Sequence, residues 1–233
     1  MKNQDNQNGI IEAPVETDKI KKVYDNIFSK IYFLFAFMEK KAHMRGIELA
    51  QIKPDDKVLE VAVGIGLSFI EILKRVDSKN VVYGIDLSPE MVEKTRKLAT
   101  KKGYTNFDLK EGDARHLPFP DDSFDVLFSN YMLDLIQIAD FSAVIKEFNR
   151  VLKKDGRLAL VNLSKKDSSP VLYEKLYKLS PYFAGGCRPV LMESYVKQAG
   201  FRNVKREFLG GLIPTEIVIG LKFAMFNGRG ERI

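Results

Sequence analysis

Short apolar runs alternate with segments of helical spacing along most of this chain. The first run begins at Val58 and stops at a glycine-containing turn, and residues 67–74 then have helical spacing. The same alternation recurs downstream and is typical of parallel strands joined by helices, whereas the last two runs have no helix between them and predict an antiparallel pair. The further predicted strands are 81–85, 106–110, 124–128, 157–163, 203–208 and 215–222, and the further predicted helices are 91–102, 139–152 and 192–199.

The segment before the first strand predicts a helical cap. Residues 19–51 have the pattern of two helical stretches, and the first is rich in aromatic residues. Tyr24, Phe28, Tyr32 and Phe35 have i, i+4, i+8, i+11 spacing and would share one helical face. Two interpretations stay open: this face packs the cap onto the sheet, or it roofs a bound ligand and lines an apolar acceptor site.

Composition limits the function classes. The chain has 233 residues, 45% of them apolar, which suits one domain with a sizeable core. One cysteine, Cys187, excludes an internal disulfide and favours a reducing, cytoplasmic location. Residues 1–8 are polar, unlike a signal peptide, and no apolar run is long enough to span a bilayer. His43, His116 and Cys187 lie too far apart to predict a metal site.

Charge adds little about partners. The net charge is +6, and the lysines are scattered along the chain. Scattered lysines are typical of solvated faces, so we expect no nucleic-acid partner, while contact with a membrane surface is compatible with the charge.

The turn after the first strand predicts a ligand site. Ala62, Gly64 and Gly66 remove side-chain bulk where a ligand would approach the backbone. The second strand ends in Asp86, twenty residues after Gly66, and a carboxylate at this point suits the two hydroxyl groups of a ribose. A tight strand-to-helix turn without a ligand is the alternative for the glycines alone.

The phosphate-binding fingerprint is incomplete. Phe69 occupies the place of its third glycine, and Glu60 adds negative charge just before the turn. This charge would repel a pyrophosphate and would suit a cationic nucleoside.

Five blocks in order resemble the class I S-adenosylmethionine-dependent methyltransferases, within them the branch of the ubiquinone and menaquinone biosynthesis methyltransferases. The blocks are residues 58–66, 84–91, 111–125, 150–158 and 199–201. The resemblance implies a Rossmann-like α/β fold, with a seven-stranded, mostly parallel sheet, helices on both faces, an antiparallel last strand pair and an N-terminal helical cap.

The resemblance also assigns roles to particular residues. It implies that Asp113 accepts a hydrogen bond from the adenine amino group and that Ala114 offers its backbone N–H. Leu87 and Met91 would flank the adenine, and Asn130 would face the methyl group. Tyr24 resembles the start of a Tyr-Asp pattern that closes over the cofactor. The predicted S-adenosylmethionine-binding residues are Tyr24, Glu60, Ala62, Gly64, Gly66, Asp86, Leu87, Met91, Asp113, Ala114 and Asn130.

The acceptor is the open question. Residues 130–132 lack the two prolines that base-modifying amino methyltransferases carry after Asn or Asp, which disfavours a nucleobase amine. The aromatic cap and a tyrosine-rich segment at 167–186 favour a small apolar or amphipathic acceptor: a quinol, a lipid headgroup or a hydrophobic metabolite. The related quinone methyltransferases have a longer segment there. No catalytic base is assigned, because the sulfonium is already activated.

Two other functions are considered. A non-catalytic scaffold of the same fold would have no need for three cofactor-facing acids, Glu60, Asp86 and Asp113. A nicotinamide oxidoreductase would give no role to Asp113 and would need glycine at position 69. The predicted organisation is a flexible segment at 1–18 and one methyltransferase domain at 19–233, made of a cap at 19–51, a cofactor-binding core at 52–165, a substrate-side insertion at 166–190 and a last helix and strands at 191–222.

Overall fold

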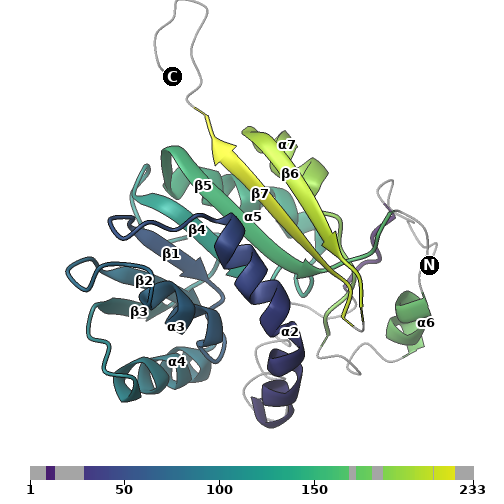
Figure 1. Cartoon of the computed structure of the whole chain (residues 1–233). Helices are drawn as coiled ribbons and strands as arrows, with labels where there is room; N and C mark the ends of the chain where they lie inside the picture. Colours follow the sequence, from purple (N-terminus) through teal and green to yellow (C-terminus); the bar gives the residue numbers. More distant parts are fainter. Residues whose placement is uncertain (1–8, 14–28, 168–171, 180–185, 212, 224–233) are drawn as a thin grey trace, which may run out of the picture.

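The computed structural model describes residues 9–13, 29–167, 172–179, 186–211 and 213–223, which form one sheet with helices packed on it (Figure 1). The strands are β1 (Val58–Val61), β2 (Val82–Asp86), β3 (Phe107–Glu111), β4 (Phe124–Asn130), β5 (Leu152–Leu163), β6 (Phe201–Leu209) and β7 (Thr215–Lys222). The helices are α2 (Ser29–Leu49), α3 (Leu67–Leu73), α4 (Pro89–Lys101), α5 (Ile138–Val151), α6 (Leu172–Leu179) and α7 (Glu193–Gln198).

The strand order places a crevice at the carboxyl ends of the central strands. Seven strands pair in the order β3-β2-β1-β4-β5-β7-β6. The pairs among β1 to β5 are parallel, and β7 is antiparallel to both β5 and β6. The order reverses between β1 and β4, and in open α/β sheets such a reversal is where ligands bind, beyond the carboxyl ends of the strands. The predicted fold class is confirmed.

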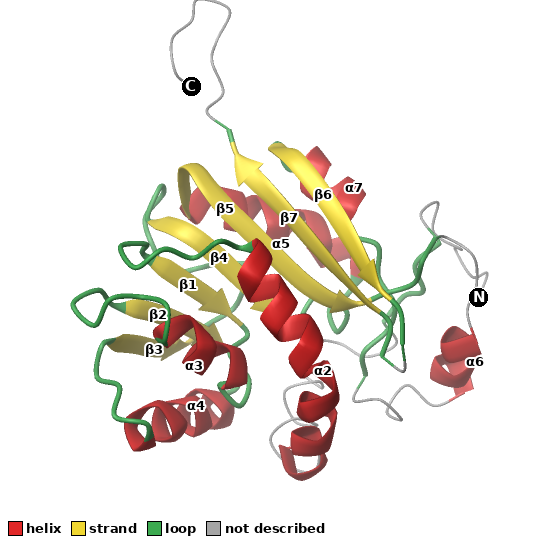
Figure 2. Ribbon diagram, in the orientation of Figure 1, coloured by secondary structure: helices red, strands yellow, loops and turns green. Residues whose placement is uncertain are grey.

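Helices cover both faces of the sheet, because side chains alternate along each strand. On β4, Val126 and Phe128 pack into the core beneath α2 and α3, whereas Leu127 packs into the core beneath α5. Figure 2 shows α2, α3 and α4 on one face and α5 and α7 on the other. The site described below lies at the end of these two core layers.

Helix α2 lies close against the sheet at Gly46. A Cβ atom on Gly46 would lie 2.5 Å from Cγ2 of Val161 and 3.2 Å from Cε2 of Phe128. Glycine is therefore what lets the helix backbone approach β4 and β5 this closely. This contact fixes the position of the α2 residues that face the end of β4.

The larger differences from the sequence-based prediction concern α2 and the start of β5. One continuous helix covers residues 29–49, where two stretches were expected, because no proline and no glycine precedes Gly46 in it. The predicted aromatic face lies outside the described residues, since residues 14–28 and the side chains of 29–38 are not described. Strand β5 begins at Leu152 rather than Arg157, since Leu152 already pairs with Phe124.

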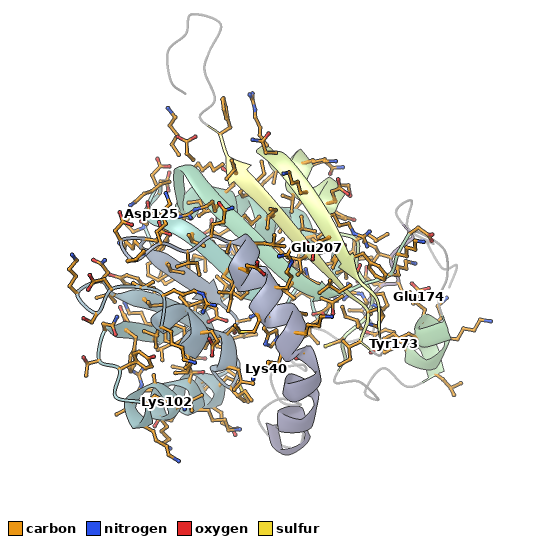
Figure 3. The ribbon with its side chains drawn as sticks, viewed as in Figure 1. Lys40, Lys102, Asp125, Tyr173, Glu174 and Glu207 are labelled. Atoms are coloured by element: carbon orange, nitrogen blue, oxygen red, sulfur yellow. The ribbon has the colours of Figure 1, made fainter. Side chains whose placement is uncertain are left out.

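Helix α6 is held to the rest of the molecule by two side chains, which Figure 3 labels. The Tyr173 hydroxyl donates to the carbonyl of Cys187 at 2.9 Å, and Glu174 accepts a hydrogen bond from Lys165 Nζ at 2.7 Å. Both Lys165 and Glu174 are buried, so this ion pair is shielded from solvent.

Candidate active site

A cavity opens at the carboxyl ends of β1, β2 and β4, where the strand order reverses. Apolar side chains make up most of its wall, and polar groups come from the ends of the strands. Such a wall binds a largely apolar ligand and orients it with a few polar contacts. It is lined by Val61, Ala62, Gly64, Ile85, Asp86, Leu87, Ser88, Met91, Gly112, Asp113, Ala114, Asn130, Tyr131, Met132, Leu135 and Ile136.

The turn between β1 and α3 forms one side of the cavity. Ala62, Gly64 and Gly66 have φ angles of 65°, 54° and 85°, in the left-handed region. Ala62 and Gly64 line the cavity, whereas Gly66 faces α4, where a Cβ would lie 2.9 Å from Oγ1 of Thr95. The left-handed conformation suits the two glycines, but it strains Ala62. Gly66 is therefore needed for packing of the turn and does not line the cavity itself.

Asp86 organises the opposite side of the turn. One carboxylate oxygen accepts from the backbone N–H of Gly64 and the other from that of Ser88, each at 2.9 Å. The Ser88 hydroxyl in turn caps α4 by accepting from the backbone of Met91 at 3.3 Å. Asp86 also lines the cavity, and a carboxylate there can accept hydrogen bonds from the hydroxyl groups of a ribose. Leu87 and Met91 lie beside it in the cavity wall.

Glu60 is fully buried and does not line the cavity, but Asn130, which donates a hydrogen bond to it, does. Its Oε1 accepts hydrogen bonds from the Ser68 hydroxyl and, at 3.3 Å, from Asn130 Nδ2, while its Oε2 has no partner among the described residues. Burial raises the pKa of Glu60 to about 8, despite the hydrogen bonds from Ser68 and Asn130. Oδ1 of Asn130 is also buried and has no partner in the part of the chain that the structure describes. A cationic group in the cavity would satisfy this acid.

Asp113 follows β3 and is bound by its neighbour Arg115. Nε and Nη2 of Arg115 contact the Asp113 carboxylate at 3.0 and 2.6 Å, and the Arg115 backbone N–H donates to it at 2.9 Å. Partial burial raises the pKa of Asp113, but the bonds from Arg115 outweigh it and hold the pKa below its ordinary value. This pairing was not predicted from the sequence. Ala114 lines the cavity beside Asp113.

The segment after β4 completes the wall. Tyr131 has a φ of 43°, its backbone N–H donates to Val161 at 2.7 Å, and its hydroxyl lies 2.8 Å from Oγ1 of Thr215. The sequence-based residue set did not include Tyr131, Met132, Leu135 or Ile136. The sequence analysis did not use Asp134, an acid within an otherwise apolar run, although such an acid is unusual enough to indicate a functional segment.

Two predictions concern other parts of the chain. Tyr24 lies outside the described residues. The segment at 167–186 was expected to cover the mouth of the site. Helix α6 is its described part, and none of the described residues of α6 lines the cavity.

Comparison with known proteins agrees with this geometry. A family model of the methyltransferase domain matches residues 58–156. The chain is 32% identical to a demethylmenaquinone methyltransferase of Staphylococcus carnosus over 226 residues, covering 91% of this chain and 90% of that protein. It is 29% identical over 174 residues to the ubiquinone/menaquinone biosynthesis C-methyltransferase UbiE of Teredinibacter turnerae, covering 72% of this chain and 68% of that one.

A solved structure shows the same fold. The YcgJ protein from Bacillus subtilis superimposes with a TM-score of 0.65 and 21% identity, covering 80% of this chain and 100% of the other. At this identity the likeness concerns the fold alone.

Proposed function

Because the chain belongs to the class I S-adenosylmethionine-dependent methyltransferases, in the branch of the ubiquinone and menaquinone biosynthesis enzymes, we propose that it methylates a ring carbon of a prenylated quinol. The two curated relatives are named for demethylmenaquinone and for ubiquinone and menaquinone biosynthesis. A lipid headgroup and a hydrophobic metabolite are the other acceptors that an apolar site of this kind would admit.

The buried acid Glu60 is the observation that carries the cofactor assignment. Its Oε2 has no partner among the described residues, and Asn130, which hydrogen-bonds to Glu60, lines the same cavity as Asp86. One ligand with a cationic end and a ribose would satisfy both acids. S-adenosylmethionine is such a ligand. Glu60 and Asn130 would hold its amino acid end, and Asp86 its ribose hydroxyls. Leu87, Met91, Asp113 and Ala114 would surround its adenine.

The protein residues act mainly by positioning. When bound, the sulfonium supplies an electrophilic methyl carbon. Met132, Leu135 and Ile136 offer an apolar wall on which a flat acceptor ring can lie, and they exclude water from the reacting atoms. Holding donor and acceptor in a near-attack geometry can contribute roughly 7 to 11 kcal/mol to the barrier reduction.

A prenylated acceptor resides in lipid, so the proposal includes a contact with the membrane surface. The net charge of +6 suits anionic lipid headgroups. Among the described residues, no helix is long and apolar enough to cross a membrane.

A transfer assay tests the acceptor. Purified protein and methyl-labelled S-adenosylmethionine are incubated in three separate reactions. The acceptor is a short-chain demethylated quinol under reducing conditions in the first, phosphatidylethanolamine vesicles in the second and the oxidised quinone in the third. We expect label on a ring carbon of the quinol only. Transfer to the lipid headgroup, or to none of the three, would contradict the quinol proposal.

A further inference from the structure

Buried ionisable side chains gather beside the cavity, where α2 meets the end of β4. Glu39 and His43 lie one turn apart on α2, with Oε2 of Glu39 3.7 Å from Nε2 of His43. The His43 ring lies 5.5 Å from the ring of Tyr131, centroid to centroid, and Tyr131 lines the cavity next to Asn130. The charge of Asp134 acts on both Glu39 and Tyr131. We call Glu39, His43, Tyr131 and Asp134 the acid–imidazole group.

Three polar atoms of this group are buried without a hydrogen-bond partner among the described residues: Oε2 of Glu39, Nε2 of His43 and Oδ1 of Asp134. These three residues are at most 7% exposed. A buried polar atom without a partner costs about 1 to 3 kcal/mol, and native proteins keep few of them. Three such atoms around one tyrosine therefore indicate a polar ligand that completes their hydrogen bonds.

Tyr131 stands between the cofactor cavity and a second cavity. The second cavity lies between α2 and the β6–β7 hairpin and is lined by Lys41, Ala42, Tyr131, Leu209, Gly210, Gly211, Ile213 and Thr215. The backbone of Tyr131 is in the left-handed region, and its hydroxyl is held by Thr215. Strained backbone at a non-glycine residue tends to occur at functional sites. An acceptor ring beside Tyr131 would reach both the cofactor cavity and this second space.

The protonation states suit a proton transfer. Burial, and then the charge of Asp134, raises the pKa of Glu39 to about 8, and burial raises that of Asp134 to about 7. Burial lowers the pKa of His43 to about 4, so its imidazole is neutral near pH 7. Groups with pKa values near the working pH are the ones that exchange protons effectively. The other titratable groups that act on these residues are Arg188, Glu216 and Cys187.

We propose that the acid–imidazole group is the polar end of the acceptor site, which binds a hydroxyl group of a planar acceptor ring and accepts the proton that this hydroxyl loses during methyl transfer. The inference rests on the proposed function, because it assumes a hydroxylated ring as the acceptor.

The methyl transfer breaks and forms bonds in both the acceptor and the methyl donor. The acceptor O–H bond breaks, and its proton passes to the acid–imidazole group. The electron pair left on oxygen makes the neighbouring ring carbon more nucleophilic. This carbon then forms the new bond to the methyl carbon. The methyl–sulfur bond breaks with its electron pair retained by sulfur. The ring carbon then loses its hydrogen as a proton to water, which restores the aromatic ring, and the acid–imidazole group returns its proton to the ring oxygen.

Ligand binding tests the site without catalysis. The probes are a prenylated 1,4-dihydroxynaphthalene and its dimethyl ether, titrated anaerobically into the full chain saturated with S-adenosylhomocysteine. We expect the diol to bind at least tenfold more tightly than the diether, and Glu39→Gln, His43→Gln and Asp134→Asn each to reduce this preference at least threefold. The control Glu48→Gln, on the exposed side of the same helix, keeps it. Equal binding of diol and diether by the wild type would overturn the inference.

Kinetics separate this inference from the proposed function. If the wild type prefers the diol but transfers no methyl group, the proposed reaction fails and the site stands. If the wild type methylates the diol, we expect Glu39→Gln and His43→Gln to lower kcat about 10²-fold or more, to shift the pH–rate profile and to leave S-adenosylhomocysteine affinity within threefold. Folded variants with unchanged kcat and an unchanged pH–rate profile would overturn the inference.

Discussion

The buried carboxyl group of Glu60 accepts a hydrogen bond of 3.3 Å from the side-chain amide of Asn130, 70 residues further along the chain. This contact joins the ends of β1 and β4, the two strands between which the sheet order reverses. Within the described part of the chain, Oε2 of Glu60 and Oδ1 of Asn130 have no hydrogen-bond partner, and Asn130 lines the cofactor cavity. Two of the polar groups expected to hold the methionine end of the cofactor are thus already positioned by the fold.

Cofactor binding should release a proton from Glu60. Its pKa is about 8 in the free protein, because burial disfavours the carboxylate, and the ammonium group of the cofactor would lower it. Affinity for S-adenosylhomocysteine should therefore rise with pH between about 6 and 8. Calorimetry in two buffers of different ionisation enthalpy measures the released proton. Glu60→Gln should release none and should bind with an affinity that does not depend on pH, and a wild-type protein that takes up a proton would contradict this assignment.

The stability of the cofactor-free protein should fall as pH rises from about 6.5 to 8. Folding raises the pKa values of Glu39 and Glu60 to about 8 and that of Asp134 to about 7, so the folded state holds protons that the unfolded chain has lost. Each group contributes a slope of up to ~1.4 kcal/mol per pH unit. Burial lowers the pKa of His43 from 6.5 to about 4. Above pH 6.5 this imidazole is neutral in both the folded and the unfolded chain, so it opposes the trend only below that pH. Urea unfolding at pH 6.5 and 8 measures the change, and equal stability at the two values would argue against these buried acids.

Ala62→Gly should stabilise the protein by about 1 kcal/mol, because the φ angle of 65° at Ala62 strains any residue with a Cβ. Chemical unfolding of both proteins provides the comparison. Ala99→Gly, at a buried position within α4, serves as the control and should lose about 1 kcal/mol or more. A loss of stability in Ala62→Gly as well would show that the turn is not strained at this residue.

Gly84→Ala should destabilise the protein by about 1 to 3 kcal/mol through overpacking. A Cβ on Gly84 would lie 2.5 Å from Leu109, 2.7 Å from Val63 and 2.9 Å from Phe69, all side-chain atoms of the core. Thermal unfolding tests this, with Gly210→Ala as the control, because nothing lies within 4 Å of a Cβ there. Equal effects of the two substitutions would contradict the packing explanation.

Gly84 also explains why one sequence signal was incomplete. The dinucleotide fingerprint uses its third glycine for close packing of helix on strand, and this chain has Phe69 at that place. The ring of Phe69 instead packs where Gly84 of β2 leaves space. The strand order, the turn and Asp86 follow from local patterns and from motif order, so they were predictable.

The acceptor side depends on contacts between distant segments, which periodicity does not reveal. His43 meets Tyr131 across 88 positions of the chain, and neither residue belongs to a recognisable motif. The charge of Asp134 acts on Glu39 of α2, a helix that lies close against β4 and β5 at Gly46. The pairing of Asp113 with Arg115 was also missed, although the two residues are close in sequence, because a motif match does not show how a carboxylate is already engaged.

Calorimetric titration with S-adenosylmethionine and S-adenosylhomocysteine, for the wild type and Asp86→Ala and with NAD as the comparison ligand, tests the central assignment most directly. We expect the wild type to bind both nucleosides and not to bind NAD, and we expect Asp86→Ala to lose at least tenfold in affinity for the two nucleosides. Undiminished binding in Asp86→Ala, or binding of NAD in place of the two nucleosides, would contradict the site described here.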